Sequence, residues 1–402
     1  MNIRRLPQLL LYSTLFLFRI PNLYILPFIH NSFLTTQGIG RIILLLFVIS
    51  ALYFRKYKVN SSLNVENILV ILLLLVQTAS IVVAINIPAF LMRYKDIVIA
   101  VMLFFAVKTI KIDIRMVVKI IVMTAIINSL YAVVVIYFPA IHPLFKAVTY
   151  ERYFNLVLSD IERGRYYATS YDEVILPLLL SEGRLFLAAL ISAITLIGNF
   201  RTKILSLFFV FFSYLLLIKD ERIKKHMMKI VLGVIIVGAL AAIFSISRES
   251  YLERFNIGDN EQIETITSRA DQIAVGLNLG RMPLGVGLGN YYDYLPTQDK
   301  KNILTSKNEQ IRMREVHDSI HNNFASVLAE SGYLALFIYT ALILNFLRQD
   351  ILALLQKEGR KKIFILMFWG IFIYGFLNPG VALSYQFQYW FYRGLISNEN
   401  IN

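Results

Sequence analysis

The stretch HDSIHNNFASVLAESGYLALFIY, from His317 to Tyr339, passes from a polar loop into a strongly apolar helix. His321 stands at the junction, where water, the membrane interface and a hydrophobic span are expected to meet. Because the pKa of a histidine is ordinarily close to neutral, an imidazole there can take a proton from a hydroxyl group held beside it. The alternative is an interfacial histidine that only caps a membrane-spanning helix.

The composition of the 402 residues is that of a membrane protein. Hydrophobic residues make up 57% and charged residues 16%, with a mean hydropathy of +0.62, whereas about 25% charged is usual in soluble proteins. The apolar runs, of about 15 to 25 residues, are long enough to cross a bilayer as helices. We therefore expect an all-α, polytopic membrane protein. The absence of cysteine excludes disulfides, thiolate chemistry and zinc sites with cysteine ligands.

The net charge of +14 indicates topology and not nucleic-acid binding, because the basic residues form short clusters between the apolar runs. Such clusters mark the cytoplasmic side and also favour contact with anionic membrane lipids. They lie at Arg4–Arg5, Arg55–Lys58, Lys108–Lys119, Lys219–Lys229 and Arg348–Lys362.

Counting crossings between these clusters predicts about 12 spans, with both ends of the chain in the cytoplasm. The start of the chain, basic and then apolar, lacks a signal-peptide cleavage site and is expected to be an uncleaved first span. The predicted division is nine spans in 1–247, one large external loop at 248–320 and three spans in 321–402. The expected spans lie near 8–29, 39–54, 66–87, 97–108, 117–138, 168–182, 185–199, 203–218, 229–247, 322–347, 363–377 and 380–393.

This count places Arg201 on the external side, where short loops normally avoid arginine. A guanidinium outside the positive-inside pattern calls for an anionic partner, so Arg201 is a candidate for binding phosphate. The alternatives are an arginine that extends from a helix end toward water, or an error in the count.

The external loop contains an amphipathic helix and a glycine-rich turn. Apolar residues at helical spacing in QIETITSRADQIAVGLNLG predict a helix that lies over the membrane. Arg269 lies in this helix, either as a ligand for an anion or as an exposed neighbour of Asp271 without a special role. The turn RMPLGVGLGN, residues 281–290, has no lysine and no strand–helix context, so it does not match a nucleotide-binding loop. It predicts a tight turn whose backbone amides approach a ligand such as phosphate, or which packs closely.

Aromatic residues follow the turn, and histidines follow the loop. Tyr291 and its neighbours are candidates for stacking on sugar rings or for anchoring at the membrane interface. His317 and His321 are four residues apart, but with Asp318 they make a weak metal site, and no HExxH pattern is present. We therefore predict no metal and no cofactor. No DxD-type nucleotide-sugar site is present either, so a glycosyl donor would be lipid-linked.

Three segments resemble the O-antigen ligase and O-antigen polymerase family of membrane glycosyltransferases. These are His321-Asn322 followed by Gly332, the run SRADQIAVGLNLGRMPLGVGLGN (268–290), and ITLIGNFRTKILS (194–206). The resemblance implies a GT-C-like fold in the bacterial inner membrane, with the active site facing the periplasm. It also implies an undecaprenyl-diphosphate-linked glycan as donor and a reaction that needs no metal.

The resemblance assigns roles to residues. His321 is carried over as the base for the acceptor hydroxyl, and Arg201 and Arg269 are the candidates for stabilising the leaving diphosphate. Asn322 is expected to orient the imidazole or to cap the helix. Further substrate-binding candidates are Arg163, Arg165, Arg281, His317 and Tyr291.

Within this family the sequence slightly favours a polymerase, which transfers glycan onto a lipid-linked repeat unit. The basic and aromatic segment YERYFNLVLSDIERGRYYATSYDE (150–173) has enough arginine to hold a second lipid diphosphate, although a solvated loop explains it nearly as well. A ligase, which transfers the glycan to lipid A-core, remains the alternative. A flippase and a scaffold without chemistry are the other classes, and no internal repeat of the kind common in transporters is evident. The expected partners are the lipid-linked donor and acceptor, membrane lipids and a chain-length regulator, but no nucleic acid.

Overall fold

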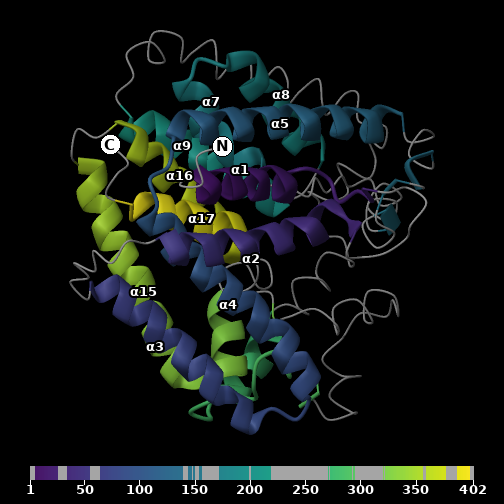
Figure 1. Cartoon of the computed structure of the whole chain (residues 1–402). Coiled ribbons are helices and arrows are strands. Elements are labelled where there is room, and N and C mark those ends of the chain that lie inside the picture. The colour runs from purple at the N-terminus through teal and green to yellow at the C-terminus, as the bar shows by residue number, and fades with distance from the viewer. Residues whose placement is uncertain are drawn as a thin grey trace.

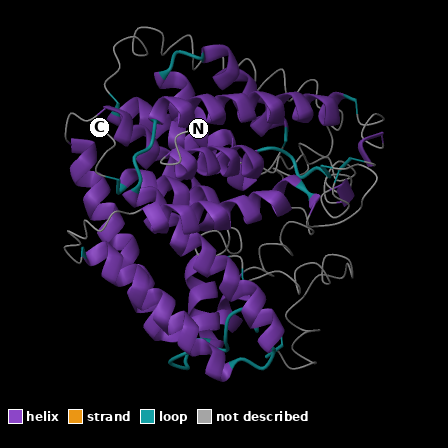
Figure 2. Ribbon diagram, viewed as in Figure 1, coloured by secondary structure: helices purple, strands orange, loops and turns teal. Residues whose placement is uncertain are grey.

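The computed structural model describes residues 5–25, 34–54, 64–138, 144–146, 148–149, 154–155, 172–198, 201–218, 270, 272–291, 293–294, 320, 322–355, 359–376 and 387–398. The regular elements in these ranges are helices (Figure 2). The strand-like pairings among them are two isolated bridges, Leu23 with Thr149 and Tyr24 with Thr35. The described part of the chain is thus all-α, as predicted.

Most of the helices coincide with the apolar runs, and polar residues set several of their starts. Asn64, Asn86 and Asp113 each accept a hydrogen bond from a backbone N–H of the first turn that follows. The elements are α1 (Leu6–Arg19), α2 (Thr36–Phe54), α3 (Val65–Ala79), η3 (Ser80–Val83), α4 (Ile87–Thr109), α5 (Ile114–Tyr137), η5 (Asp172–Ile175), α7 (Leu176–Ser181), α8 (Leu185–Ile197), α9 (Arg201–Leu217), α15 (Asn323–Leu355), α16 (Gly359–Phe376) and α17 (Phe387–Ile396).

Four helical segments in the described ranges are long and apolar enough to cross a membrane: Thr36–Tyr53, Val65–Val83, Ile114–Val135 and Asn323–Leu355. Two shorter apolar helices, Leu185–Ile197 and Thr202–Leu217, lie where spans were also expected. The larger number of about 12 spans stays a prediction. The span expected at 229–247 lies outside the described residues, as does much of the loop at 248–320.

The first and the fourth predicted spans differ from the helices found. The first was expected to run through residues 8–29, but α1 ends at Arg19 because Ile20 is extended and Pro21 has no N–H to continue the helix. The fourth was expected only at 97–108, whereas α4 begins at Ile87. The charged residues Arg93, Lys95 and Asp96 precede the predicted span but lie within α4.

The helices form two groups that run in different directions (Figure 1). In one group α1 packs on α2 and on α5, and α16 packs on α9 and α17. In the other group α3 runs beside α15, with α4 next to them. Because α17 also packs on α4, the last helix joins the two groups.

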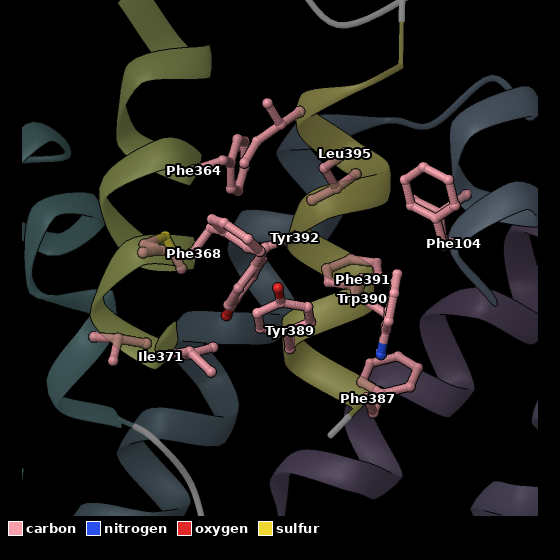
Figure 3. Packing of buried hydrophobic residues seen from close by; sticks show 14 of the residues in the cluster. Phe104, Phe364, Phe368, Ile371, Phe387, Tyr389, Trp390, Phe391, Tyr392 and Leu395 are labelled. Carbon is pink, nitrogen blue, oxygen red and sulfur yellow. The ribbon is translucent and has the colours of Figure 1, made fainter. Parts of the chain in front are cut away.

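Aromatic side chains fill the space between α16, α17 and α4 (Figure 3). The rings of Phe368 and Tyr389 lie with their centroids 4.7 Å apart, and Trp390 meets Phe104 of α4 edge-on at 6.0 Å. Gly394 allows this close approach, since a Cβ there would lie 2.8 Å from the Cβ of Val107.

A buried ionic cluster ties four helices together. Nε of Arg393 donates to Glu66 at 3.0 Å, and its Nη1 donates to Asp350 at 2.8 Å. Lys108 pairs with the other oxygen of Glu66 at 3.0 Å. The guanidinium of Arg393 also stacks over the ring of Phe346, 4.0 Å from its centroid. The cluster therefore fixes the positions of α3, α4, α15 and α17 relative to one another.

Candidate functional site

The long helix α15 is broken at Gly332, which has φ 79° and ψ 178°. The rings of Phe324 and Tyr339, which precede and follow the break, lie 5.2 Å apart. In a continuous helix these positions would be roughly 22 Å apart along the axis. The helix therefore folds back on itself, and the single span expected at 322–347 is corrected to two arms. We call residues 323–331 the inner arm and residues 333–355 the outer arm.

The glycine-rich turn of the loop docks on this break. The backbone N–H of Val286 donates to the carbonyl of Ala329 at 2.9 Å, and that of Gly287 donates to the carbonyl of Glu330 at 3.0 Å. In an unbroken helix these carbonyls would accept from the outer arm. A side chain at Gly332 would collide with the carbonyl of Pro283. The turn therefore packs closely on α15, and these two amides are used by the protein, leaving neither for a phosphate.

On its other side the turn is fixed to the connection between α3 and α4. The side-chain oxygen of Asn290 accepts from the backbone N–H of Asn86, and its Nδ2 donates to the carbonyl of Asn86 at 3.2 Å. The hydroxyl of Tyr294 donates to the carbonyl of Val83 at 2.6 Å. Gly287 fits against Ala84, whose Cβ would lie 2.7 Å from a Cβ at the glycine. The turn thus bridges the α3–α4 connection and the break in α15.

Asn322 directly precedes the inner arm and caps it. The side-chain oxygen of Asn322 accepts from the N–H of Ala325 at 3.0 Å, and its Nδ2 donates to the carbonyl of Phe376 at 3.3 Å. This second bond ties the start of the inner arm to the end of α16. Ile320, two residues earlier, is almost fully buried. The residues on either side of position 321 are therefore held by packing and hydrogen bonds.

The loop helix, residues 272–279, runs in the same direction as the inner arm. A Cβ at Gly276 would lie 2.7 Å from the side chain of Ile320, and one at Gly280 would collide with the side chain of Leu328. The later residue of the loop helix meets the later residue of the inner-arm segment. The two helices are therefore parallel and start at the same end. Arg281 follows the loop helix and is exposed.

Tyr291 packs inside the protein, with 5% of its surface exposed, against Ile320, Ala325 and Ala329. Its hydroxyl has no hydrogen-bond partner among the described residues, and burial raises the pKa of that hydroxyl. Its ring has no open face for a sugar and does not reach outward as an interfacial anchor would. The expectation of either role is corrected, because the turn carries Tyr291 inward against α15.

Several predicted site residues cannot be placed. His321, His317, Arg269, Arg163 and Arg165 lie outside the described residues. Arg201 begins α9, but only its backbone is described. Among the described residues no group of histidine, aspartate and glutamate is arranged to hold a metal ion.

The first turn of α9 contains charged and polar residues that sequence reasoning did not select. Lys203 lies 4.0 Å from Glu173 of η5, and both side chains are buried. The hydroxyl of Ser206, one turn later, donates to the carbonyl of Gly370 in α16 at 2.9 Å. A sequence feature that could have indicated this pair is Asp172-Glu173 at the start of an apolar run, where charged residues are rare.

Comparison with known protein families finds a match over part of these elements. Residues 186–340 match the family model described as O-antigen ligase. The match begins in α8 and ends in the outer arm of α15, so it includes Arg201, the glycine-rich turn and His321. No curated protein matches the chain. Members of this family are membrane glycosyltransferase-like enzymes, which act on lipid-linked glycans. Residues 186–340, less than half of the chain, are therefore similar to the O-antigen ligase family.

Proposed function

We propose that the protein is a polysaccharide polymerase of the bacterial inner membrane. It transfers an undecaprenyl-diphosphate-linked glycan onto a lipid-linked repeat unit at the periplasmic face. The observation that carries this proposal is the family match over residues 186–340, together with the location of two candidate segments beside one helix, α16. Asn322 contacts the end of α16 at Phe376, and α9 contacts the same helix at Gly370.

Helix geometry supports a location of these two segments at the same end of α16. Phe376 lies about 9 Å beyond Gly370 along α16, and position 201 lies about 7 to 8 Å before Ser206 along α9. The predicted topology runs α9 and α16 in opposite directions. The start of α9 and the start of the inner arm are then at the same end of α16. This would put Arg201 and His321 at one membrane face.

Side-chain contacts between distant segments support the predicted topology. Arg360 lies 3.9 Å from Glu182, and both belong to segments expected in the cytoplasm. The ionic cluster of Glu66, Lys108 and Arg393 likewise joins segments expected on that side. The contacts of Asn290 and Tyr294 with the α3–α4 connection join segments expected outside.

The proposed reaction is an inverting displacement. The acceptor hydroxyl oxygen attacks the anomeric carbon, the bond from that carbon to the diphosphate oxygen breaks, and the hydroxyl proton passes to His321. Arg201 and Arg269 stabilise the charge on the departing diphosphate, a role that guanidinium groups fill through paired hydrogen bonds. Asn322 holds the segment that contains the base. Arg163, Arg165, Arg281 and His317 are proposed to bind the second lipid-linked substrate, with no metal or cofactor involved.

A ligase with the same base and diphosphate site remains the second candidate, because only the acceptor differs. The basic segment 150–173 favours the polymerase, since it offers cations for a second lipid diphosphate. Deletion in the native host distinguishes the classes. Surface glycan of single repeats indicates a polymerase, polymer on the lipid carrier a ligase, and loss of all external glycan a flippase. A chain-length regulator is the proposed protein partner of a polymerase.

The direct test is transfer in reconstituted vesicles that contain purified lipid-linked repeat units. His321→Ala should lower the rate by about 10²- to 10⁴-fold, the usual contribution of a general base. Arg201→Ala should also lower the rate severely, while Arg360→Ala, which removes a half-exposed arginine elsewhere, should not. Full transfer by both His321→Ala and Arg201→Ala would overturn the mechanism. A product formed only when lipid A-core is added would identify a ligase.

A further inference from the structure

A buried network fixes η5 relative to three helices. Nε of Arg19 donates to the hydroxyl of Thr124 at 3.0 Å and Nη1 to the hydroxyl of Tyr392 at 3.3 Å, while Nη2 donates to Asp172 at 2.6 Å. The other oxygen of Asp172 accepts from Nδ2 of Asn128 at 3.0 Å. Arg19 is 0% exposed. Because its partners come from α5, α17 and η5, the network sets where η5 lies.

The next residue, Glu173, connects η5 to the first turn of α9. Its Oε2 lies 4.0 Å from Nζ of Lys203, and the two side chains are only 2% and 5% exposed. Its Oε1 has no hydrogen-bond partner among the described residues. One turn further along α9, Ser206 is bonded to Gly370. The start of α9 is therefore held on one side by η5 and on another by α16.

Stability alone does not explain why Glu173 and Lys203 form a buried ion pair. A buried ion pair costs desolvation energy that its attraction often fails to repay, and apolar replacements of similar volume are frequently neutral or stabilising. Ionisable groups within apolar segments instead mark functional positions. Positions 201 and 203 do not share a helix face. Anchoring α9 through position 203 therefore leaves position 201 on another side of the helix.

We infer that Glu173 and Asp172 are positioning residues for the diphosphate site. The Arg19–Asp172 pair holds η5, and Glu173 holds the first turn of α9 through Lys203, which sets the backbone from which Arg201 reaches the leaving diphosphate. The inference rests on the proposed role of Arg201. It adds residues of η5, which precede the family match at 186–340, to the machinery of transfer.

The test measures kcat and the KM for the lipid-linked donor in reconstituted vesicles. Glu173→Gln should lower kcat by about 10- to 100-fold, since a displacement of about 1 Å can cost a reaction 10²-fold. The KM should change much less, because the arginine acts on charge that develops in the transition state. The double variant Glu173→Gln/Lys203→Met should regain thermal stability, because it removes both charges of the pair and not one alone, but it should not regain kcat. Lys203→Arg, which keeps a cation opposite Glu173, should retain kcat.

Asp350→Asn is the matched control, because it changes a buried carboxylate that also pairs with an arginine, in the cluster around Arg393. It should lower thermal stability and leave kcat and KM close to wild type. A folded Glu173→Gln variant with wild-type kcat would overturn the inference, as would an equal loss of kcat in Asp350→Asn. If Arg201→Ala itself retains full transfer, the proposed role of Arg201 fails first. If Arg201→Ala loses transfer but Glu173→Gln keeps the wild-type kcat, only the positioning role is wrong.

Discussion

Asn290 holds the backbone of Asn86 with both ends of its side-chain amide, accepting from the N–H and donating to the carbonyl. Because Asn290 is fully buried, this contact replaces water at a position that could not otherwise be satisfied. It joins the glycine-rich turn to the α3–α4 connection, while the same turn bonds to the broken part of α15. The turn is therefore a structural bridge, and the stability of the inner arm should depend on it.

Asn290→Asp should detach the turn, because the carboxylate keeps the shape of the side chain but loses the N–H donors to Asn86 and Leu288. The loss of partners for buried groups costs about 1 to 3 kcal/mol. Hydrogen exchange in detergent should show faster exchange of the amides of residues 285–291. Asp293→Asn, the reverse change at an exposed neighbour, is the control and should leave the exchange rates unaltered.

Gly332→Ala should be far more damaging than the same change at Gly183. Both glycines have positive φ, 79° and 69°, so both variants incur backbone strain of about 1 to 3 kcal/mol. A Cβ at Gly183 meets nothing within 4 Å, whereas one at Gly332 collides with the carbonyl of Pro283. Thermal unfolding of the two variants in the same detergent measures the difference. Equal shifts in the unfolding midpoint would mean that the turn does not pack on the break.

Two tyrosines that follow the turn, Tyr291 and Tyr294, should differ in how the stability of the protein responds to loss of the hydroxyl. Tyr291→Phe should be neutral or stabilising at pH 7, because the buried hydroxyl has no partner among the described residues. Tyr294→Phe should cost about 0.5 to 1.5 kcal/mol, since it removes the hydrogen bond to Val83. Chemical denaturation of the purified variants gives both values. A larger loss in Tyr291→Phe would contradict the structure.

The burial of Tyr291 predicts that the stability of the loop depends on pH. Burial raises the pKa of Tyr291 above the ordinary value of a tyrosine, so the folded loop favours the neutral phenol. The stability that this gives is complete below the unfolded pKa and is lost as pH rises above it. Protease resistance of the loop should therefore fall above about pH 10, and it should fall less in Tyr291→Phe. Loss of resistance that begins well below that pH would point to another group.

Asp350→Ala should destabilise the protein by about 3 to 5 kcal/mol, because it leaves the buried Arg393 with one fewer carboxylate. The indole of Trp369, which donates to Asp350 at 2.8 Å, loses its partner as well. Tryptophan fluorescence during denaturation follows the change directly. Arg348→Ala, on the same helix, is a control outside this cluster and should shift the midpoint much less.

The sequence was sufficient where apolar runs alone determine an element, as in α5 and α8, whose bounds lie within a few residues of the predicted spans. The cap of α15 at Asn322 was also within reach, because its position at the start of an apolar run has a local meaning. The break at Gly332 was not, since one glycine in an apolar run reads as helix. What stabilises the break is a turn much earlier in the chain. For the same reason the pairing of Arg19 with Asp172 could not be read from residues that are far apart in sequence.

The two carbonyls freed at the break in α15 carry a consequence for biogenesis. Ala329 and Glu330 are buried, and unpaired buried backbone groups cost about 1 to 3 kcal/mol each, so the break is unfavourable until Val286 and Gly287 supply their amides. These donors belong to a segment that the ribosome makes before α15. The order of synthesis thus delivers the complementary groups before the helix that needs them, and insertion of the last fifth of the chain should wait on correct placement of the loop.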